Sequence, residues 1–159
     1  MSIATPDGQF VAWYSDRGLA RLNFPSARAA SAGSGLSAAS PKVLTWHRRT
    51  ARALKRALAG KASGPLPPLD LSSGTVFQQR VWRELRRIKT GQSRSYGEIA
   101  RAIGKPLALR AVGGACGANP LPVLVPCHRV LAANGKIGGF SGGMDWKRAL
   151  LEREGVKLG

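Results

Sequence analysis

The sequence predicts an α+β fold, in which a small β-sheet-plus-helix region precedes a mainly helical region with a helix-turn-helix. Two observations support this prediction. Near the start of the chain, short runs alternate apolar and polar residues, which is typical of paired strands. Further along, helix-capping patterns precede apolar stripes of helical spacing. We place the boundary between two predicted domains after residue 74, which gives domains over residues 1–74 and 75–159.

The first predicted domain begins with a β-hairpin. Residues 10–14 and 19–24 are predicted as strands, and Ser15-Asp-Arg-Gly18 supplies the residue types of the turn between them. Residues 26–40 are nearly all Ser, Ala and Gly, a composition typical of a flexible surface loop. Leu69-Asp-Leu71 is predicted as a short third strand.

A helix is predicted between the hairpin and this third strand. Ser40 precedes Pro41, which suits the first helical position, and Gly60 marks the end. Helical spacing predicts one buried face, formed by Leu44, His47, Ala51, Leu54 and Leu58. The remaining cations are left for solvent or for phosphates: Lys42, Arg48, Arg49, Arg52, Lys55 and Arg56.

Helix signals are sharper in the second predicted domain. Thr75-Val-Phe-Gln78 and Ser95-Tyr-Gly-Glu98 both fit the capping-box pattern. The first begins an apolar stripe of Phe77, Val81, Leu85 and Ile88, and the second begins a short helix that ends at Gly104. Pro106 is predicted to begin another helix that runs to about Gly117. Two short helices joined by a tight turn suggest a helix-turn-helix.

Composition narrows the class of protein. The chain has 159 residues, 43% of them hydrophobic, which suits one or two small domains. There is no apolar run long enough to span a membrane, and the first residues carry no secretory signal pattern. With only two cysteines, a disulfide framework is excluded and a reducing cytoplasm is expected.

The formal net charge is +17, from 25 basic and 8 acidic residues spread along the whole chain. Such a charge should attract a polyanion, and nucleic acid is the leading candidate. A solvated, arginine-rich surface is the alternative, and membrane-surface binding is less favoured because the apolar faces are needed for a core.

The helix predicted over residues 106–117 has an unusual surface. A helix that reads the major groove needs long polar side chains, but Ala111-Val-Gly-Gly-Ala-Cys-Gly-Ala118 offers almost none. Small residues permit close approach, either to another helix or to a narrow groove of nucleic acid held through phosphate contacts. Arg110, at the start of this segment, could fill the gap left by a displaced base.

Cys127 follows a short β-rich apolar run, Leu121-Pro-Val-Leu-Val125. A lone cysteine in that position is often an inert core residue. His128 and Arg129 lie beside it, however, and positive neighbours lower the pKa of a thiol. A reactive thiol and a buried structural one therefore both stay open. Cys116, Cys127 and His128 lack the spacing of a zinc site, so no metal is expected.

The segment Pro126-Cys-His-Arg-Val130 resembles the active-site motif of the O6-alkylguanine-DNA alkyltransferases. Further segments occur in the order and spacing of that family: Phe77-Gln-Gln-Arg-Val-Trp82, Ser95-Tyr-Gly-Glu-Ile-Ala100, Arg110-Ala-Val-Gly-Gly-Ala115, Asn119-Pro120, Phe140-Ser-Gly-Gly143 and Leu150-Leu-Glu-Arg-Glu-Gly155. The resemblance is strong over residues 75–155 and weak before them. It implies a small, ribonuclease H-like first domain, without the structural zinc that some relatives bind there.

The resemblance implies single-turnover DNA repair without a cofactor, in which an alkyl group passes from O6 of guanine, or from O4 of thymine, to Cys127. His128 would deprotonate the thiol through a water, Glu154 would orient His128, and Asn119 would organise the site. Tyr96 would donate a proton to the base, which the backbone of Val130 and Ser141 would hold. Phe140 would pack on the base, where many relatives carry Tyr.

The target base must leave the duplex stack, and Arg110 would take its place. Gly97, Lys105 and Ala133 match family positions near the DNA backbone, and Arg129 is also assigned to DNA binding. The expected partner is duplex DNA containing O6-alkylguanine, bound by a monomer with no membrane contact. The alternatives are a non-catalytic protein that binds the alkylated lesion, a helix-turn-helix regulator and a cysteine hydrolase. Cys127 argues against the first, and the missing base-reading side chains argue against the second.

Overall fold

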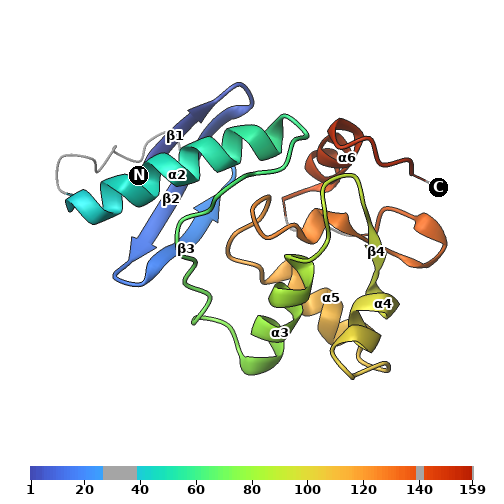
Figure 1. The fold of residues 1–159 in the computed structure, drawn as a ribbon. Helices are drawn as coiled ribbons and strands as arrows, with labels where there is room; N and C mark the ends of the chain where they lie inside the picture. The colour runs from blue at the N-terminus through green and yellow to red at the C-terminus, as the bar shows by residue number, and fades with distance from the viewer. Residues whose placement is uncertain (27–38, 139–141, 159) are drawn as a thin grey trace.

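The computed structural model describes residues 1–26, 39–138 and 142–158. These residues form a mixed α/β structure, with a three-stranded sheet in the amino-terminal part and helices in the carboxyl-terminal part (Figure 1). The predicted loop over residues 26–40 lies mostly outside the described residues. Among the described helices, none is long and apolar enough to cross a membrane.

The sheet has the order β1-β2-β3 and is antiparallel throughout, with strands β1 (Ser2–Thr5), β2 (Gly8–Ser15) and β3 (Gly18–Asn23). This confirms the predicted hairpin, while β1 was missed because four residues give little periodic signal. The predicted third strand at residues 69–71 is wrong. Leu69 forms only one isolated parallel bridge, with Leu19, since Pro67 and Pro68 just before it have no N–H to extend a ladder.

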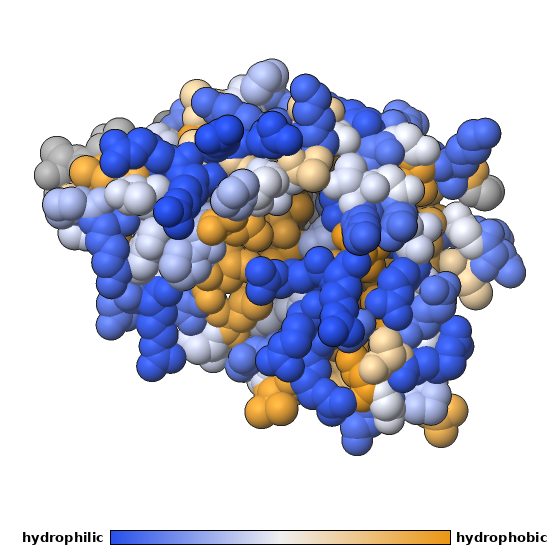
Figure 2. Space-filling model, in the orientation of Figure 1, coloured by the Kyte–Doolittle hydropathy of each residue, from blue (hydrophilic) through white to orange (hydrophobic). Residues whose placement is uncertain are grey.

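The helix predicted after Ser40 is confirmed as α2 (Pro41–Leu58), and it covers the sheet (Figure 1). The Ser40 side chain accepts a hydrogen bond from the Val43 backbone N–H and caps its first turn. The buried face differs in part from the prediction, because Leu44 and Ala51 are only half-buried. The buried residues of this helix are Trp46, His47, Thr50, Ala53, Leu54, Ala57 and Leu58. The cations that the sequence leaves outside are all exposed, and hydrophilic residues cover most of the face shown in Figure 2.

Four helices build the carboxyl-terminal part: α3 (Val76–Leu85), α4 (Tyr96–Ala102), α5 (Leu109–Gly117) and α6 (Met144–Arg153). Both predicted capping boxes are confirmed, at Thr75 with Gln78 and at Ser95 with Glu98. The short strands β4 (Arg94–Ser95) and β5 (Val130–Leu131) pair in parallel, and the sequence showed no sign of this pair. Helix α6 was also missed.

Two predictions of local structure in this part are wrong. Helix α5 begins at Leu109 rather than Pro106, because residues 103–108 form the connection from α4. Residues 121–125 form turns rather than a β-rich run. Their prolines remove ladder donors, and Val123 adopts a φ of 74°, outside the extended region.

A single cluster of buried apolar side chains joins the sheet, α2 and the carboxyl-terminal helices. Phe10, Leu19 and Leu54 belong to it from the amino-terminal part, and Trp82 and Leu121 from the rest. The backbone of the two parts also meets directly, because the Leu22 N–H donates to the Pro120 carbonyl over 2.9 Å. The loop that precedes Cys127 is therefore packed against the sheet.

Candidate active site

Cys127 begins a short 3-10 helix, η2 (Cys127–Arg129), and lies at the wall of a cavity. Its exposed fraction is 3%, which fits a core residue, but the cavity reaches it and has a volume of about 730 Å³. Tyr96, Gly97, Arg110 and Ala133 line the same cavity. Five residues that the sequence assigned to the site, Cys127 among them, thus meet at one hollow next to α5.

Asn119 fixes the loop that leads to the cysteine. Its side-chain N–H donates to the Val125 carbonyl over 2.7 Å, and its side-chain oxygen accepts from the Leu121 N–H over 3.0 Å. The amide is buried and bridges both ends of a segment that has no strand to order it. This geometry supports the organising role predicted for Asn119.

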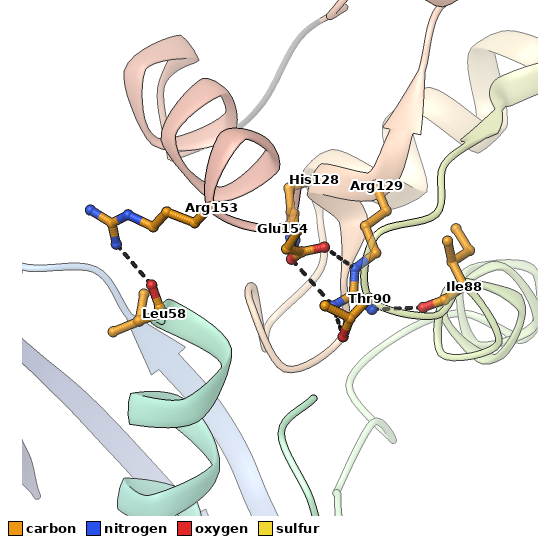
Figure 3. Close-up of polar contacts among 7 residues, drawn as sticks. All are labelled: Leu58, Ile88, Thr90, His128, Arg129, Arg153 and Glu154. Atoms are coloured by element: carbon orange, nitrogen blue, oxygen red, sulfur yellow. Dashed lines mark hydrogen bonds and ion pairs between the residues drawn. The ribbon is translucent and has the colours of Figure 1, made fainter. Parts of the chain in front are cut away.

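Behind the cysteine, Glu154 binds two residues of η2 (Figure 3). Its carboxylate lies 2.7 Å from His128 Nε2 and 2.7 Å from Arg129 Nε. Burial alone would raise the pKa of Glu154, but the hydrogen bonds from His128 and Arg129 outweigh it and hold that pKa at about 2. Glu154 is therefore an ionised acceptor at neutral pH.

This pair sets the tautomer of His128. Burial lowers the pKa of His128 more than Glu154 raises it, so the ring is neutral. An ionised carboxylate can only accept, so Nε2 carries the proton and donates it to Glu154. The other nitrogen, Nδ1, is buried and has no protein hydrogen-bond partner among the described residues. It is a free lone pair, available to accept a proton.

The prediction that positive neighbours lower the pKa of Cys127 is wrong. Burial raises the pKa of this thiol to about 11. His128 contributes no charge because it is neutral, and the charge of Arg129 is paired with Glu154. The Asn119 side chain, the charge of Lys147 and local backbone groups lower the pKa only partly. The thiol is therefore protonated in the unliganded protein.

Arg129 does not occupy the position predicted for a DNA contact. Its guanidinium donates to Glu154, to the Ile88 carbonyl over 2.6 Å and to the Thr90 hydroxyl over 3.1 Å (Figure 3). Only 11% of its side chain is exposed. We reassign Arg129 to a structural role, in which its guanidinium connects η2 to Glu154 and to the segment that follows α3.

Two residues near the thiol did not enter the sequence-based site. Cys116, on α5, also lines the cavity, and burial raises its pKa to about 12. Lys147, on α6, has no exposed surface and donates from Nζ to the Val130 carbonyl over 2.7 Å. Its ammonium lies 5.9 Å from the centre of the Tyr96 ring. A lysine within a helix is ordinarily exposed, so no feature of the sequence pointed to Lys147.

The three glycines of α5 face open space, whereas Ala115 and Cys116 on the same helix are buried. A Cβ placed on Gly113, Gly114 or Gly117 would meet no other atom within 4 Å. This excludes the reading in which these glycines permit a tight contact with another helix. Arg110 and Ala111 are exposed on the same helix. The exposed glycines of α5 thus leave a smooth surface beside the cavity, and two arginines line the cavity itself, Arg110 from α5 and Arg101 from α4.

The remaining predicted residues are placed as follows. Lys105 is exposed in the connection between α4 and α5 and does not line the cavity. Val130 is buried in β5. Phe140 and Ser141 lie outside the described residues.

Burial raises the pKa of Tyr96 to about 12, as do the neighbouring thiols, so its hydroxyl stays protonated and can donate. Among the described residues, no cluster of His, Cys, Asp and Glu could hold a metal.

A second contact ties this site to the amino-terminal part. Arg153, next to Glu154, forms a two-bonded ion pair with Asp7, with distances of 2.7 and 2.9 Å. It also donates to the Leu58 carbonyl at the end of α2 over 3.0 Å (Figure 3). Gly60 permits this approach, since a Cβ there would collide with the Arg153 carbonyl.

The fold and the cavity define a class of protein. In this class a buried thiol lies at the wall of a cavity beside an exposed helix rich in small residues, and a hydrogen-bonded His–Glu pair lies behind the thiol. The model of the protein family described as "6-O-methylguanine DNA methyltransferase, DNA binding domain" matches residues 76–156 of this chain. The chain belongs to this family.

Curated relatives share this part of the chain. A methylated-DNA--protein-cysteine methyltransferase of Mycobacterium bovis is 60% identical over 86 residues, which cover 54% of this chain and 52% of that protein. A protein of the same name from Methanosarcina acetivorans is 47% identical over 107 residues, which cover 65% of this chain and 69% of that protein. The chain thus spans about half the length of the first of these relatives.

Solved structures match nearly the whole chain. Mycobacterium tuberculosis OGT, crystallised in complex with DNA, has a TM-score of 0.76 and 38% identity, and the match covers 96% of this chain and 90% of that one. An O6-methylguanine-DNA methyltransferase from Pyrococcus kodakaraensis has a TM-score of 0.65 and 26% identity, with 98% of each chain covered. The mixed α/β architecture is therefore that of this family in both parts.

Proposed function

We propose that this protein repairs DNA by transferring an alkyl group from O6 of guanine in duplex DNA to Sγ of Cys127, once per molecule. The observation that carries the proposal is the position of Cys127. It lies in the wall of a cavity beside an exposed helix of small residues, with a neutral His128 whose free nitrogen can accept a proton. The names of the relatives support the same activity.

The transfer is a displacement at carbon. Sulfur forms a bond to the alkyl carbon while the bond from that carbon to O6 breaks, and the electrons return to guanine. The thiol proton passes to His128 Nδ1 through a water, and Glu154 stabilises the imidazolium that results. Tyr96 gives the leaving guanine a proton, and the proton held by His128 returns through water to Tyr96, so that both side chains end neutral. The product is a stable thioether, so no step regenerates the thiol.

Deprotonation of the thiol contributes more to the rate of transfer than an ordinary cysteine pKa would imply. An ordinary thiol with a pKa of about 8.5 is roughly 3% ionised at pH 7, so full ionisation would gain only about 30-fold. With a pKa of about 11, only about one molecule in 10⁴ is ionised. Deprotonation by His128 is therefore a large part of the barrier that the site must lower, together with the alignment of sulfur and carbon.

The DNA must deliver its base into the cavity. We propose that α4 and α5 act as a helix-turn-helix whose second helix enters the minor groove, with the flat face of Gly114 and Gly117 against the backbone. The target nucleotide turns out into the cavity, and Arg110 fills the vacated place. The backbone of Gly97 and Ala133, at the cavity wall, and the ammonium of Lys105 contact phosphates.

Other parts of the assignment rest on the family. Residues 1–74 form a ribonuclease H-like domain and residues 75–159 form the DNA-binding and alkyl-transfer domain, which is supported by the start of the family match at residue 76. Phe140 packs on the flipped base, and the backbone of Val130 and Ser141 holds its edges. O4-alkylthymine is a second substrate. The protein acts as a monomer in the cytoplasm, without a cofactor.

A non-catalytic protein that binds the alkylated lesion is the second candidate, and the buried, protonated state of Cys127 is the observation that favours it. Mass spectrometry of the intact protein separates the two. After incubation with duplex DNA containing O6-methylguanine, the wild type should gain one methyl group, located on the peptide that contains Cys127.

Cys116→Ser is the matched control, because it removes the other thiol of the same cavity. It should still gain the methyl group, whereas Cys127→Ser should gain none and leave the lesion in the DNA. A wild-type protein that binds the lesion but gains no mass would favour the second candidate.

A further inference from the structure

Lys147 is a buried cation beside the thiol, and the steps described above do not use it. It belongs to the first turns of α6, has no exposed surface, and reaches the Val130 carbonyl of β5. Burying an ammonium costs several kcal/mol unless nearby groups compensate. The Val130 carbonyl compensates part of this cost through one charge-assisted hydrogen bond.

Three titratable groups near this ammonium come from three different elements of the cavity. Cys127 lies on η2, Cys116 on α5 and Tyr96 on α4. Burial lowers the pKa of Lys147, while the ionised forms of the two thiols raise it. In return, the charge of Lys147 lowers the pKa of both thiols. The ammonium is thus coupled to the sulfur atoms.

His128 and Arg129, which follow the thiol in η2, supply no free positive charge to it; Arg101 and Arg110 line the same cavity, but Lys147 is the cation whose charge acts on the thiol. Arg129 is paired with Glu154, and His128 is neutral until it accepts a proton. When His128 does accept the thiol proton, its new charge is balanced by Glu154. The thiolate that remains needs a positive charge of its own, because an unpaired anion in a buried site is strongly disfavoured.

We propose that Lys147 is a positioning residue that stabilises the Cys127 thiolate as it forms and holds strand β5 at the cavity. This inference rests on the proposed alkyl transfer and adds to it. Lys147 keeps its proton throughout: the thiol proton goes to His128, the sulfur becomes an anion beside the ammonium, and that negative charge leaves with guanine O6 when the S–C bond forms.

The test measures thiol ionisation separately from DNA repair. In a Cys116→Ser background, iodoacetamide modifies Cys127 at a rate proportional to the thiolate fraction at any pH below the thiol pKa. Lys147→Gln keeps a side-chain donor for the Val130 carbonyl and removes the charge. An opposite charge within a few ångströms typically lowers an acidic pKa by about one unit or more. Lys147→Gln should therefore lower the rate about tenfold at each pH from 6 to 9.

Lys147→Arg is the matched control, because it keeps the positive charge. It should restore most of the rate with iodoacetamide, and both variants should bind undamaged duplex DNA as the wild type does. Transfer from free O6-benzylguanine should fall in parallel with the iodoacetamide rate. If Lys147→Gln reduces transfer but leaves the iodoacetamide rate and its pH profile unchanged, Lys147 only tethers α6 to β5 and the proposal is wrong.

A measurement that needs no change at position 147 covers the case in which these variants do not fold. In a Cys116→Ser protein that also carries Arg101→Ala and Arg110→Ala, and so lacks both arginines that line the cavity, iodoacetate should react with Cys127 faster relative to iodoacetamide than it does with a small free thiol. An equal ratio would overturn the proposal. Failure of the proposed function looks different, since the wild type would then take no alkyl group from DNA, whatever the thiol titration shows.

Discussion

Glu154→Gln should destabilise the protein and slow the alkyl transfer, because one carboxylate orients both His128 and Arg129. The fall in pKa of Glu154 from 4.5 to about 2 corresponds to roughly 3 kcal/mol in favour of the ionised form. Removing one partner of a buried ion pair has a similar cost of about 3–5 kcal/mol, since it leaves the guanidinium of Arg129 without its counter-charge. We expect a loss of about 3 kcal/mol in the free energy of unfolding at pH 7.

The same change alters the base. A glutamine amide can present its N–H₂ to His128, which would favour the tautomer with the proton on Nδ1 and remove the lone pair that accepts the thiol proton. General base catalysis is typically worth about 10²–10⁴-fold, so the rate of transfer should fall by a factor in that range. Single-turnover kinetics with O6-methylguanine in duplex DNA measure this rate.

The pH dependence gives an independent check on Glu154. Because its pKa is lowered on folding, its contribution to stability is fully present above about pH 4.5 and is lost as the pH falls toward 2. The pKa of His128 is also lowered on folding, so protonating it below about pH 6.5 destabilises the folded protein further. Urea unfolding of the wild type should show this loss between pH 6.5 and 2, and Glu154→Gln should lose less over the acid end of the range.

Glu152→Gln is the matched control, because Glu152 is exposed on the same turn of α6. It should change the free energy of unfolding by no more than about 0.5 kcal/mol. If the two glutamine variants are equally stable at pH 7 and transfer alkyl groups at equal rates, the account of the Glu154 network is wrong.

Three further predictions concern DNA. Arg110→Ala should slow repair of duplex DNA more than reaction with free O6-benzylguanine. The control Arg49→Ala, which changes an exposed arginine on α2, should affect neither rate. Equal losses in both assays for Arg110→Ala would refute its base-replacing role. Gly114→Leu should fold with unchanged or higher thermal stability, since its side chain meets open space, but should weaken DNA binding in a fluorescence titration; unweakened binding would mean that this face does not enter a groove. Affinity for undamaged duplexes should fall steeply with salt and differ little between sequences, and a strong consensus site in a selection experiment would favour a regulator.

Local chemistry made much of the fold predictable. The capping boxes at Thr75 and Ser95 and the cap of α2 at Ser40 depend on residues a few positions apart, so the sequence contains the whole signal. Strand β1 and the β4–β5 pair were not predictable in the same way, because their partners lie far along the chain or the strands are too short to show a period.

The site residues show the same contrast between local sequence signals, which were predictable, and contacts between distant residues, which were not. The motif around Cys127 indicated the candidate nucleophile and its neighbours, and the structure brings Tyr96, Arg110, Gly97 and Ala133 to the same cavity. Sequence adjacency misled for charge, because Arg129 turns away from the thiol toward Glu154, which is 25 residues away along the chain. Lys147 was missed for the related reason that its burial arises only when α6 packs against β5.

The ion pair between Arg153 and Asp7 connects the amino-terminal region to the candidate site, although none of the described residues of that region lines the cavity. Glu154 follows Arg153 directly, so the turn between the first two strands and the end of α2 anchor the carboxylate that orients the general base. A protein shortened to residues 75–159 would keep every described side chain that lines the cavity and still lose this anchor. Substitutions in the amino-terminal region can therefore alter the rate of the proposed transfer without changing any described residue of the cavity wall.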